Sequence, residues 1–255
     1  MLKSIQVLKI ILLCCFLIGC TCFKSMDENS FTNENDPLEP MNRAVFSFND
    51  TMDTYVMRPI ADGYRWIVPK FIRNAVTNLF ETLGQPAHFA NALLQGQIKD
   101  AGSVLGRTGI NLTFGFLGLF DVASEMGIPN PKNDFGQTLA KWGWHSGGPF
   151  VMLPLLGPSN VRDTIGLGAD AVADPVYWRF RDNRPLIYDE YALNGLQTRE
   201  QALDLMDNLK SSSTDYYAAM RTMYRQNRQK KINQVIPQTQ EAEQEYDFDF
   251  EIEEE

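Results

Sequence analysis

The chain begins with two lysines that lead into a short apolar run, and the nature of this segment decides which environment the later residues face. Lys3 and Lys9 carry positive charge at the beginning, and residues 10–19 are almost entirely apolar. A helix that crosses a membrane needs about 20 consecutive apolar residues, so this run is too short. A positive start followed by a short apolar run is typical of a secretory signal peptide. We therefore expect residues 1–19 to be removed during export.

The end of this run indicates a lipid anchor. Leu17-Ile18-Gly19-Cys20 has the order of a bacterial lipobox, in which a small residue precedes the cut and the cysteine thiol carries a diacylglyceryl group. An ordinary signal peptide with incidental cysteines is the alternative interpretation. We predict lipidation at Cys20, because two or more acyl chains make a lasting membrane anchor. Thr21 follows, whereas lipoproteins kept in the inner membrane usually carry aspartate there, so the sequence favours the outer membrane.

Cysteine use and charge narrow the function classes. With Cys20 lipidated, Cys22 would be left without a partner, so the mature chain must be stable through its core rather than through a disulfide. The formal net charge is −9, and nine acidic residues lie in residues 241–255. The body is therefore nearly neutral, and no basic excess indicates nucleic-acid binding. The acidic end is either a solvated, disordered tail or a docking motif that uses its interleaved aromatic residues.

The body of the chain has the apolar spacing of helices. Residues 20–35 are polar and suggest a flexible tether, and residues 237–255 form the acidic tail. Asp36, Pro37 and Glu39 have the order of a helix start, with Asp36 as cap, and Pro59 should end or kink this first helix. Its apolar stripe consists of Met41, Val45, Phe48, Met52, Tyr55 and Val56.

Glycines and prolines mark the expected limits of six further helices. These helices run from Pro69 to Gly84, from Pro86 to Gly96, from about Asp100 to Gly109, from Ser159 to about Ala173, from about Asp189 to Leu209, and from Thr214 to before Pro237. The last one carries Arg221, Arg225, Arg228, Lys230 and Lys231, either as a solvated face or as a contact for phosphate headgroups. The sequence predicts about seven helices and no sheet.

Two apolar segments lack helical spacing. Residues 109–121 and residues 147–158 are rich in glycine or proline, which argues for loops or broken helices. Neither segment is long enough to span a bilayer as a helix. In a soluble domain they would be buried, whereas in a membrane-tethered protein they could insert or line a path for an apolar molecule. The residues alone leave both interpretations open.

The sequence offers little for catalysis. The best pairs of nucleophile and base are Ser146 with His145 and Ser103 with His88, and sequence neighbours rarely face each other productively. No spacing indicates a metal site. A glycine pattern at 166–171 resembles a dinucleotide-binding turn only faintly, because no clear strand precedes it. We therefore predict no enzyme, no catalytic residue, no metal and no cofactor.

Several motifs in one order resemble the MlaA (VacJ) lipoprotein family. They are DPLEPMNRAVFSFND (36–50), RPIADGYRWIVP (58–69), NALLQG (91–96), LFDVASEMG (119–127), DFGQTLAKWG (134–143) and GPFVMLPLLGPSNVRD (148–163). The resemblance implies an all-α domain over residues 36–236. In that family the helices form a ring within the periplasmic leaflet of the outer membrane, around an amphipathic channel. Members remove phospholipid misplaced in the outer leaflet, pass it to a periplasmic carrier, and associate with trimeric porins.

This resemblance gives the glycine-rich segment 109–121 a possible role. We expect a mobile apolar loop that borders the lipid path, with Gly109, Gly115 and Gly118 giving it freedom. The loop would consist of Phe114, Phe116, Leu117, Leu119 and Phe120, and the polar channel candidates are Asn111, Thr113 and Asp121. The alternative function is an envelope lipoprotein that binds a partner or contributes to virulence without transporting lipid.

Overall fold

The computed structural model describes residues 36–174, 177–178 and 184–236, with the backbone alone described for residues 184–187. The expected signal peptide, the lipidation site Cys20, the tether and the acidic tail lie outside the described residues. The described residues from Pro37 onward belong to one compact unit, which contains all the elements below.

The first helical stretch is longer than the sequence predicts. Helix α2 (Glu39–Met52) continues through a π-helical turn, η2 (Asp53–Met57), into α3 (Arg58–Ile67). Pro59 lies in the first turn of α3, so an end at this residue is wrong, whereas the alternative, a kink, stays a prediction. A proline is tolerated in the first turn of a helix, and the π-turn before it absorbs the local change in hydrogen bonding. The expected cap by Asp36 is also wrong, because Leu38 occupies the N-cap position of α2.

The next two predicted helices are one. Helix α4 (Lys70–Leu94) runs through Gly84 and Pro86 without interruption. It packs against α5 (Ile98–Thr113), α7 (Phe135–Lys141) and α10 (Arg184–Ser212). Such packing outweighs the one helical hydrogen bond that a proline removes. The expected stop at Gly96 is confirmed, since this glycine has a positive φ of 73° directly after the helix.

Two glycine-containing regions form structure that the sequence did not predict. A short helix, α6 (Val122–Glu125), follows the loop after α5, and α7 begins with a capping box made by Asp134 and Gln137. Strands β1 (Phe150–Leu153) and β2 (Gly157–Asn160) form an antiparallel ribbon with Leu153 opposite Gly157. The prediction of no sheet is therefore wrong, since the structure contains this one hairpin. The sequence did not show it, because a four-residue strand is too short for a clear alternation of apolar residues.

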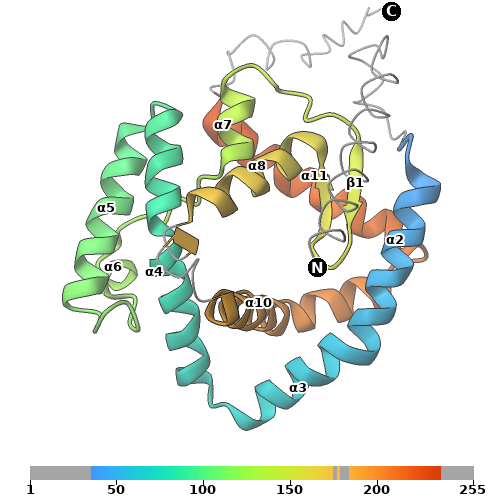
Figure 1. Ribbon diagram of the computed structural model, residues 1–255, viewed down its shortest axis with the longest axis horizontal. Coiled ribbons are helices and arrows are strands. Elements are labelled where there is room, and N and C mark those ends of the chain that lie inside the picture. Colours follow the sequence, from blue (N-terminus) through green and yellow to red (C-terminus); the bar gives the residue numbers. More distant parts are fainter. Residues whose placement is uncertain (1–35, 175–176, 179–183, 237–255) are drawn as a thin grey trace, which may run out of the picture. The chain divides into compact units, whose positions relative to one another are not determined.

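Within this unit the packing contacts between neighbouring elements form a closed cycle. Helix α8 (Val161–Ala173) packs on α7, α11 (Tyr216–Val235) packs on α7, α10 and β2, and α10 packs on α3 and α4. Helix α2 completes the path by packing on β1. Figure 1 shows α4, α8, α10 and the β1–β2 hairpin arranged around a central region. The fold is all-α apart from the hairpin, as expected.

Candidate functional site

Helix α3 turns its apolar face outward and its charged face toward the protein. Arg58 and Arg65 lie seven residues apart on one face, where they pair with Asp207 and with Glu200 of α10 at 2.7 and 2.8 Å. On the opposite face Ile67 is 69% exposed. A water-soluble protein places these two kinds of residue the other way round. This helix is therefore built to lie against an apolar phase.

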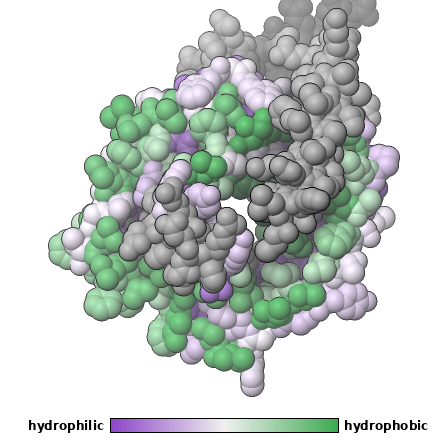
Figure 2. Space-filling view, viewed as in Figure 1, coloured by the Kyte–Doolittle hydropathy of each residue, from purple (hydrophilic) through white to green (hydrophobic). Residues whose placement is uncertain are grey.

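Buried polar residues and exposed apolar residues also occur in other parts of the unit, beside a small apolar core at Phe150, Met152 and Tyr217. The largest fully buried side chains of the described residues include Arg107, Arg162 and Gln137. Figure 2 shows hydrophobic residues spread around the edge of the visible face. The most exposed of the large hydrophobic residues are Tyr55, Trp66, Ile67, Phe71, Ile98, Phe114, Phe116, Leu117, Leu155 and Leu156. Exposed apolar surface of this extent marks contact with a membrane or another apolar partner. No described helix is both long enough and apolar enough to cross a bilayer.

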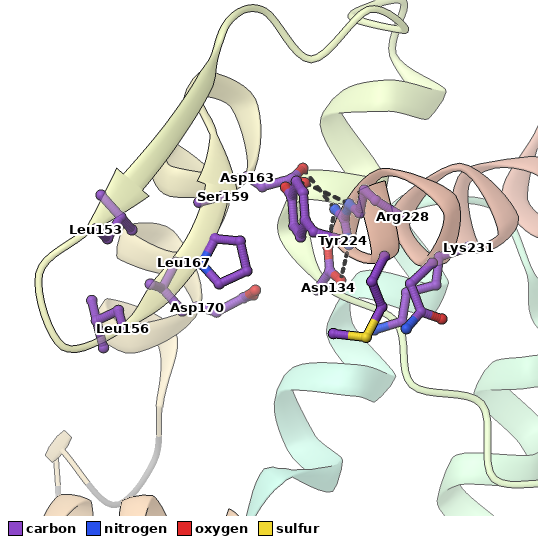
Figure 3. Close-up of a pocket in the computed structure, with 13 residues that line it drawn as sticks. Asp134, Leu153, Leu156, Ser159, Asp163, Leu167, Asp170, Tyr224, Arg228 and Lys231 are labelled. Carbon is purple, nitrogen blue, oxygen red and sulfur yellow. Dashed lines mark hydrogen bonds and ion pairs between the residues drawn. The ribbon is translucent and has the colours of Figure 1, made fainter. Parts of the chain in front are cut away.

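A pocket lies between α8, α11, the β1–β2 hairpin and the start of α7 (Figure 3). Its volume is about 430 Å³, within the range of small-molecule sites. The hairpin and α8 supply apolar side chains, and the other wall is mostly polar. The lining residues are Asp134, Leu153, Leu156, Pro158, Ser159, Asp163, Leu167, Asp170, Met223, Tyr224, Asn227, Arg228 and Lys231. Such a pocket suits a molecule with one charged and one apolar part.

An ion network centred on Arg228 forms the polar wall. Its guanidinium donates to both carboxylate oxygens of Asp134, at 2.6 and 2.8 Å, and to Asp163 at 2.8 Å. Tyr224 donates its hydroxyl proton to Asp163 over 2.6 Å. Burial alone would raise the pKa of Asp134, but hydrogen bonds and charge from Arg228 outweigh burial and lower it. Asp134 therefore stays ionised at neutral pH, and the network joins α7, α8 and α11.

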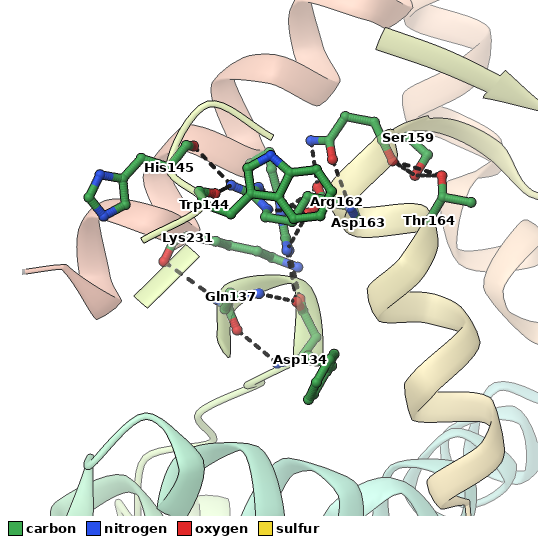
Figure 4. Close-up of polar contacts among 12 residues, drawn as sticks. Asp134, Gln137, Trp144, His145, Ser159, Arg162, Asp163, Thr164 and Lys231 are labelled. Carbon is green, nitrogen blue, oxygen red and sulfur yellow. Dashed lines mark hydrogen bonds and ion pairs between the residues drawn. The ribbon is translucent and has the colours of Figure 1, made fainter. Parts of the chain in front are cut away.

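Arg162 holds the loop that leads into the hairpin (Figure 4). Its guanidinium donates to the carbonyl oxygens of Trp144 and His145, at 3.1 and 3.0 Å, and to Asp163 at 2.9 Å. The imidazole of His145 points away from this network. His145 therefore contributes its backbone carbonyl here, not its imidazole.

Asp170 faces the pocket and is held by neutral hydrogen-bond donors. Its carboxylate accepts hydrogen bonds from Asn91 Nδ2 at 2.8 Å and from the Phe135 backbone N–H at 3.0 Å. Burial raises the pKa of Asp170, and the neighbouring charge of Asp134 adds to this effect. Asp170 is therefore the pocket carboxylate whose negative charge the protein compensates least.

Two glycines allow α7 and α8 to approach closely. A Cβ atom at Gly166 would lie 2.5 Å from the Gly136 backbone nitrogen, and one at Gly136 would overlap the Arg228 guanidinium. Gly166 lies inside α8, so the faint dinucleotide-binding pattern at 166–171 reflects helix packing. This close contact brings Asp163 and Asp134 to the same side of Arg228.

Two asparagines of α2 fix the hairpin through its backbone. Asn42 donates to the Phe150 carbonyl at 3.0 Å and accepts from the Met152 N–H at 2.8 Å. Asn49, seven residues later on the same helical face, bonds in the same way to the Leu153 carbonyl at 2.9 Å and the Leu155 N–H at 2.8 Å. The hairpin tip, with the pocket residue Leu156, is thereby held by α2.

The polar residues that the sequence suggested for a channel do not line this pocket, and their role in a channel stays a prediction. Asp121 pairs bidentately with the buried Arg107, at 2.7 and 2.8 Å, and accepts from Asn111 at 2.9 Å. Thr113 is exposed and donates to the Gly109 carbonyl within its own helix. Figure 1 places α5 and α6 on the outer side of α4. These residues position the loop between α5 and α6 and do not line the pocket.

The loop itself carries exposed apolar side chains, but its glycines serve close packing. Phe114, Phe116, Leu117 and Phe120 are between 59% and 77% exposed, and Leu119 is half-buried. A Cβ at Gly115 would overlap the Phe120 carbonyl, and one at Gly118 would lie 2.6 Å from the Thr82 hydroxyl. Gly118 also has a positive φ of 89°. The expected mobility of the loop stays a prediction.

Sequence reasoning missed most of the pocket. Arg228 and Lys231 were recognised as part of a basic cluster, and the structure separates them, because Arg228 is buried between two carboxylates and Lys231 is exposed. Asp134 and Arg228 are 94 residues apart, so no local pattern could pair them. The Nδ1 atom of His88 lies 2.7 Å from the Asn133 carbonyl oxygen. The imidazole therefore contacts a backbone group here, not the hydroxyl of a serine nucleophile.

Comparison with known proteins decides the family. The family model described as MlaA lipoprotein matches residues 34–231. The chain belongs to the MlaA lipoprotein family. It is 35% identical to the intermembrane phospholipid transport system lipoprotein MlaA of Shigella flexneri, over 82% of this chain and 81% of that protein. The Haemophilus influenzae protein of the same name is 30% identical over 91% and 92% of the two chains.

A solved structure supports the same assignment. The structure, described as "Structural basis for maintenance of bacterial outer membrane lipid asymmetry", superposes with a TM-score of 0.68 at 33% sequence identity. The match covers 78% of this chain and all of the other. An uncharacterized protein of Rickettsia prowazekii is 32% identical over 87% of this chain and 91% of its own length.

Proposed function

We propose that this protein is an outer-membrane lipoprotein that removes misplaced phospholipid from the outer leaflet and so maintains lipid asymmetry. The observation that carries the proposal is the inverted surface together with the two-sided pocket. Many large apolar residues are exposed, Arg107 and Arg162 are buried, and the pocket has apolar side chains on one side and mostly polar ones on the other. The names of the relatives and the neighbouring structure support this function.

The distribution of side chains suggests how lipid moves. Helices such as α3 lie in the plane of the leaflet with their apolar faces toward acyl chains. Polar groups in the interior are tolerated because protein surrounds them rather than lipid. A phospholipid then passes with its headgroup beside the ion network of Arg228 and its acyl chains beside Leu153, Leu156 and Leu167.

Anchoring and partners complete the proposal. Lipidation at Cys20 tethers the chain to the outer membrane on the periplasmic side. A soluble periplasmic carrier accepts the lipid, and a trimeric porin associates with the protein in the membrane. The direction of transport comes from the higher lipid affinity of the downstream components.

The proposal assigns no chemical reaction to the chain. A hydrolase would need a serine within reach of an imidazole. His88 instead contacts a backbone carbonyl, and the ring of His145 points away from the Arg162 network. Released fatty acid would be the signature of hydrolysis, so its measurement separates the two functions.

The test is to delete the gene and label phospholipid exposed on the cell surface. We expect exposed phospholipid to accumulate, and both the wild type and a Ser103→Ala/Ser146→Ala double variant to reverse this. Leu156→Asp should fail to restore asymmetry, because it places a charge on the apolar wall. Leu155→Asp is the matched comparison, since Leu155 is equally exposed at the hairpin tip but does not line the pocket, and an equal loss in both variants would trace the defect to the exposed apolar surface instead of the pocket. Unchanged surface phospholipid after deletion would contradict the proposal and favour a partner-binding lipoprotein.

A further inference from the structure

We propose that the pocket selects phospholipids whose headgroup joins a phosphate to a primary ammonium, and disfavours headgroups that are only anionic. This inference rests on the proposed function, because it names the lipid class that the pocket accepts. Asp170 would receive the ammonium group and Lys231 the phosphate, with the apolar hairpin beside the first carbons of the acyl chains.

The charges of the network set this preference. Arg228 is the buried cation of the pocket, but Asp134 and Asp163 already bind it at 2.6 to 2.8 Å. It therefore has little attraction left for an incoming phosphate. Asp134 and Asp163 are paired with Arg228, and Asp163 also with Arg162 at 2.9 Å, so Asp170 is the carboxylate of the lining that is held by neutral donors. An ammonium group would supply Asp170 with a cation, whereas a purely anionic headgroup would bring a second negative charge close to it.

Asp170 is suited to receive the ammonium. It lines the pocket, and its two hydrogen bonds come from the neutral donors Asn91 Nδ2 and the Phe135 N–H. A carboxylate has about four acceptor positions, so at least one is left for a ligand. Burial raises the pKa of Asp170, in keeping with these neutral donors.

Lys231 is suited to receive the phosphate. It lies three residues after Arg228 on α11, lines the pocket and is exposed. It forms no ion pair with any other residue that the structure describes. Figure 3 shows Asp170 on the side of the hairpin and Lys231 on α11 across the pocket. A zwitterionic headgroup can therefore bridge the two walls.

The apolar side chains of the pocket fix the orientation of the lipid. Leu153 and Leu156 lie on the hairpin, and Leu167 lies on α8 one turn before Asp170. The carboxylate that would bind the ammonium is thus next to an apolar surface. Such a neighbourhood strengthens a charge contact, because fewer water molecules screen it.

The experiment measures which lipids the full-length lipoprotein retains in detergent micelles. The protein is equilibrated with equimolar phosphatidylethanolamine and phosphatidylglycerol of identical acyl chains, and bound lipid is quantified by mass spectrometry. We expect the wild type to favour phosphatidylethanolamine at least about fivefold, the factor for one unit-charge contact even at the dielectric constant of water. Asp170→Asn should bring the ratio close to one. Asp62→Asn, on the exposed part of α3, should leave the ratio as in the wild type.

A second variant keeps the proposal testable if Asp170→Asn fails to fold. Lys231→Gln changes an exposed residue, so folding should be preserved, and it should lower retention of both lipids while keeping the ratio. A folded Asp170→Asn protein with the wild-type ratio, or Lys231→Gln with unchanged retention, would overturn the inference. Equal retention of both lipids by the wild type would overturn it too, but would leave the proposed function intact. A wild type that retains no phospholipid would refute the proposed function itself.

Discussion

Two buried arginines hold two different parts of this protein, and their partners differ in distance along the chain. Arg107 pairs with Asp121, only 14 residues later, and positions the apolar loop beside α6. Arg228 pairs with Asp134 and Asp163, which are 94 and 65 residues away, and joins three helices around the pocket. The first pair fixes a local element, whereas the second determines whether the pocket exists.

The largest effect should come from removing the long-range pairing. Arg228→Met leaves the carboxylates of Asp134 and Asp163 without their main cation, so we expect unfolding to become easier by about 3–5 kcal/mol. Chemical denaturation in detergent, followed by circular dichroism, measures this loss. Arg228→Met should also fail to restore outer-membrane lipid asymmetry in the deletion strain.

Arg107→Met is the matched variant for this comparison. Only one carboxylate, that of Asp121, loses its cation here, and it keeps hydrogen bonds from Asn111 and from the Ser124 backbone N–H. We expect a smaller loss of stability, and faster cleavage of residues 114–121 by added protease. An equal loss from both arginines would show that the two regions unfold as one unit.

The contact between α7 and α8 should give the next largest effect. Gly166→Ala pushes a methyl group into the Gly136 backbone, and overpacking of this kind costs about 1–3 kcal/mol. Gly168→Ala lies two residues later in the same helix, where a Cβ meets nothing within 4 Å. There alanine should stabilise the protein by about 0.5–1 kcal/mol, because it favours a helix over glycine. Thermal unfolding of both variants tests this, and the same sign of change would contradict the assigned packing.

Acidification should produce the smallest and most specific effect. The pKa of Asp134 in the folded protein is lowered, so its contribution to stability is present above the ordinary aspartate value of about 4 and is lost as the pH falls through the lowered value. Asp121 has a lowered pKa as well, so both regions should weaken on the acid side. Asp170 has a raised pKa and acts in the opposite sense, because its contribution is lost as the pH rises through the raised value.

Stability measured from pH 6 to pH 3 in the wild type and in Asp134→Asn checks this expectation. The variant should be less stable at pH 6 and should lose less on acidification. A pH dependence identical to that of the wild type would show that Asp134 titrates alike in the folded and unfolded chain.

The sequence predicted local features better than distant ones. The helix starting after Ser159 and the stop at Gly96 follow from neighbouring residues, and the structure confirms both. The helix through Pro86 was missed because packing on three other helices outweighs a local preference. The polar candidates Asn111 and Asp121 do interact, but with Arg107 and not with the pocket. The pocket depends on pairs that only the folded chain brings together.

The asparagines of α2 also have a consequence for how copies of this protein behave when crowded in one leaflet. A two-stranded ribbon presents a free edge to which a strand from another molecule could add. Asn42 and Asn49 occupy three backbone groups of β1 and the N–H of Leu155, which follows the strand. Strand addition at this edge would first have to displace two side-chain amides. The hairpin can therefore face many identical neighbours without joining them into a continuous sheet.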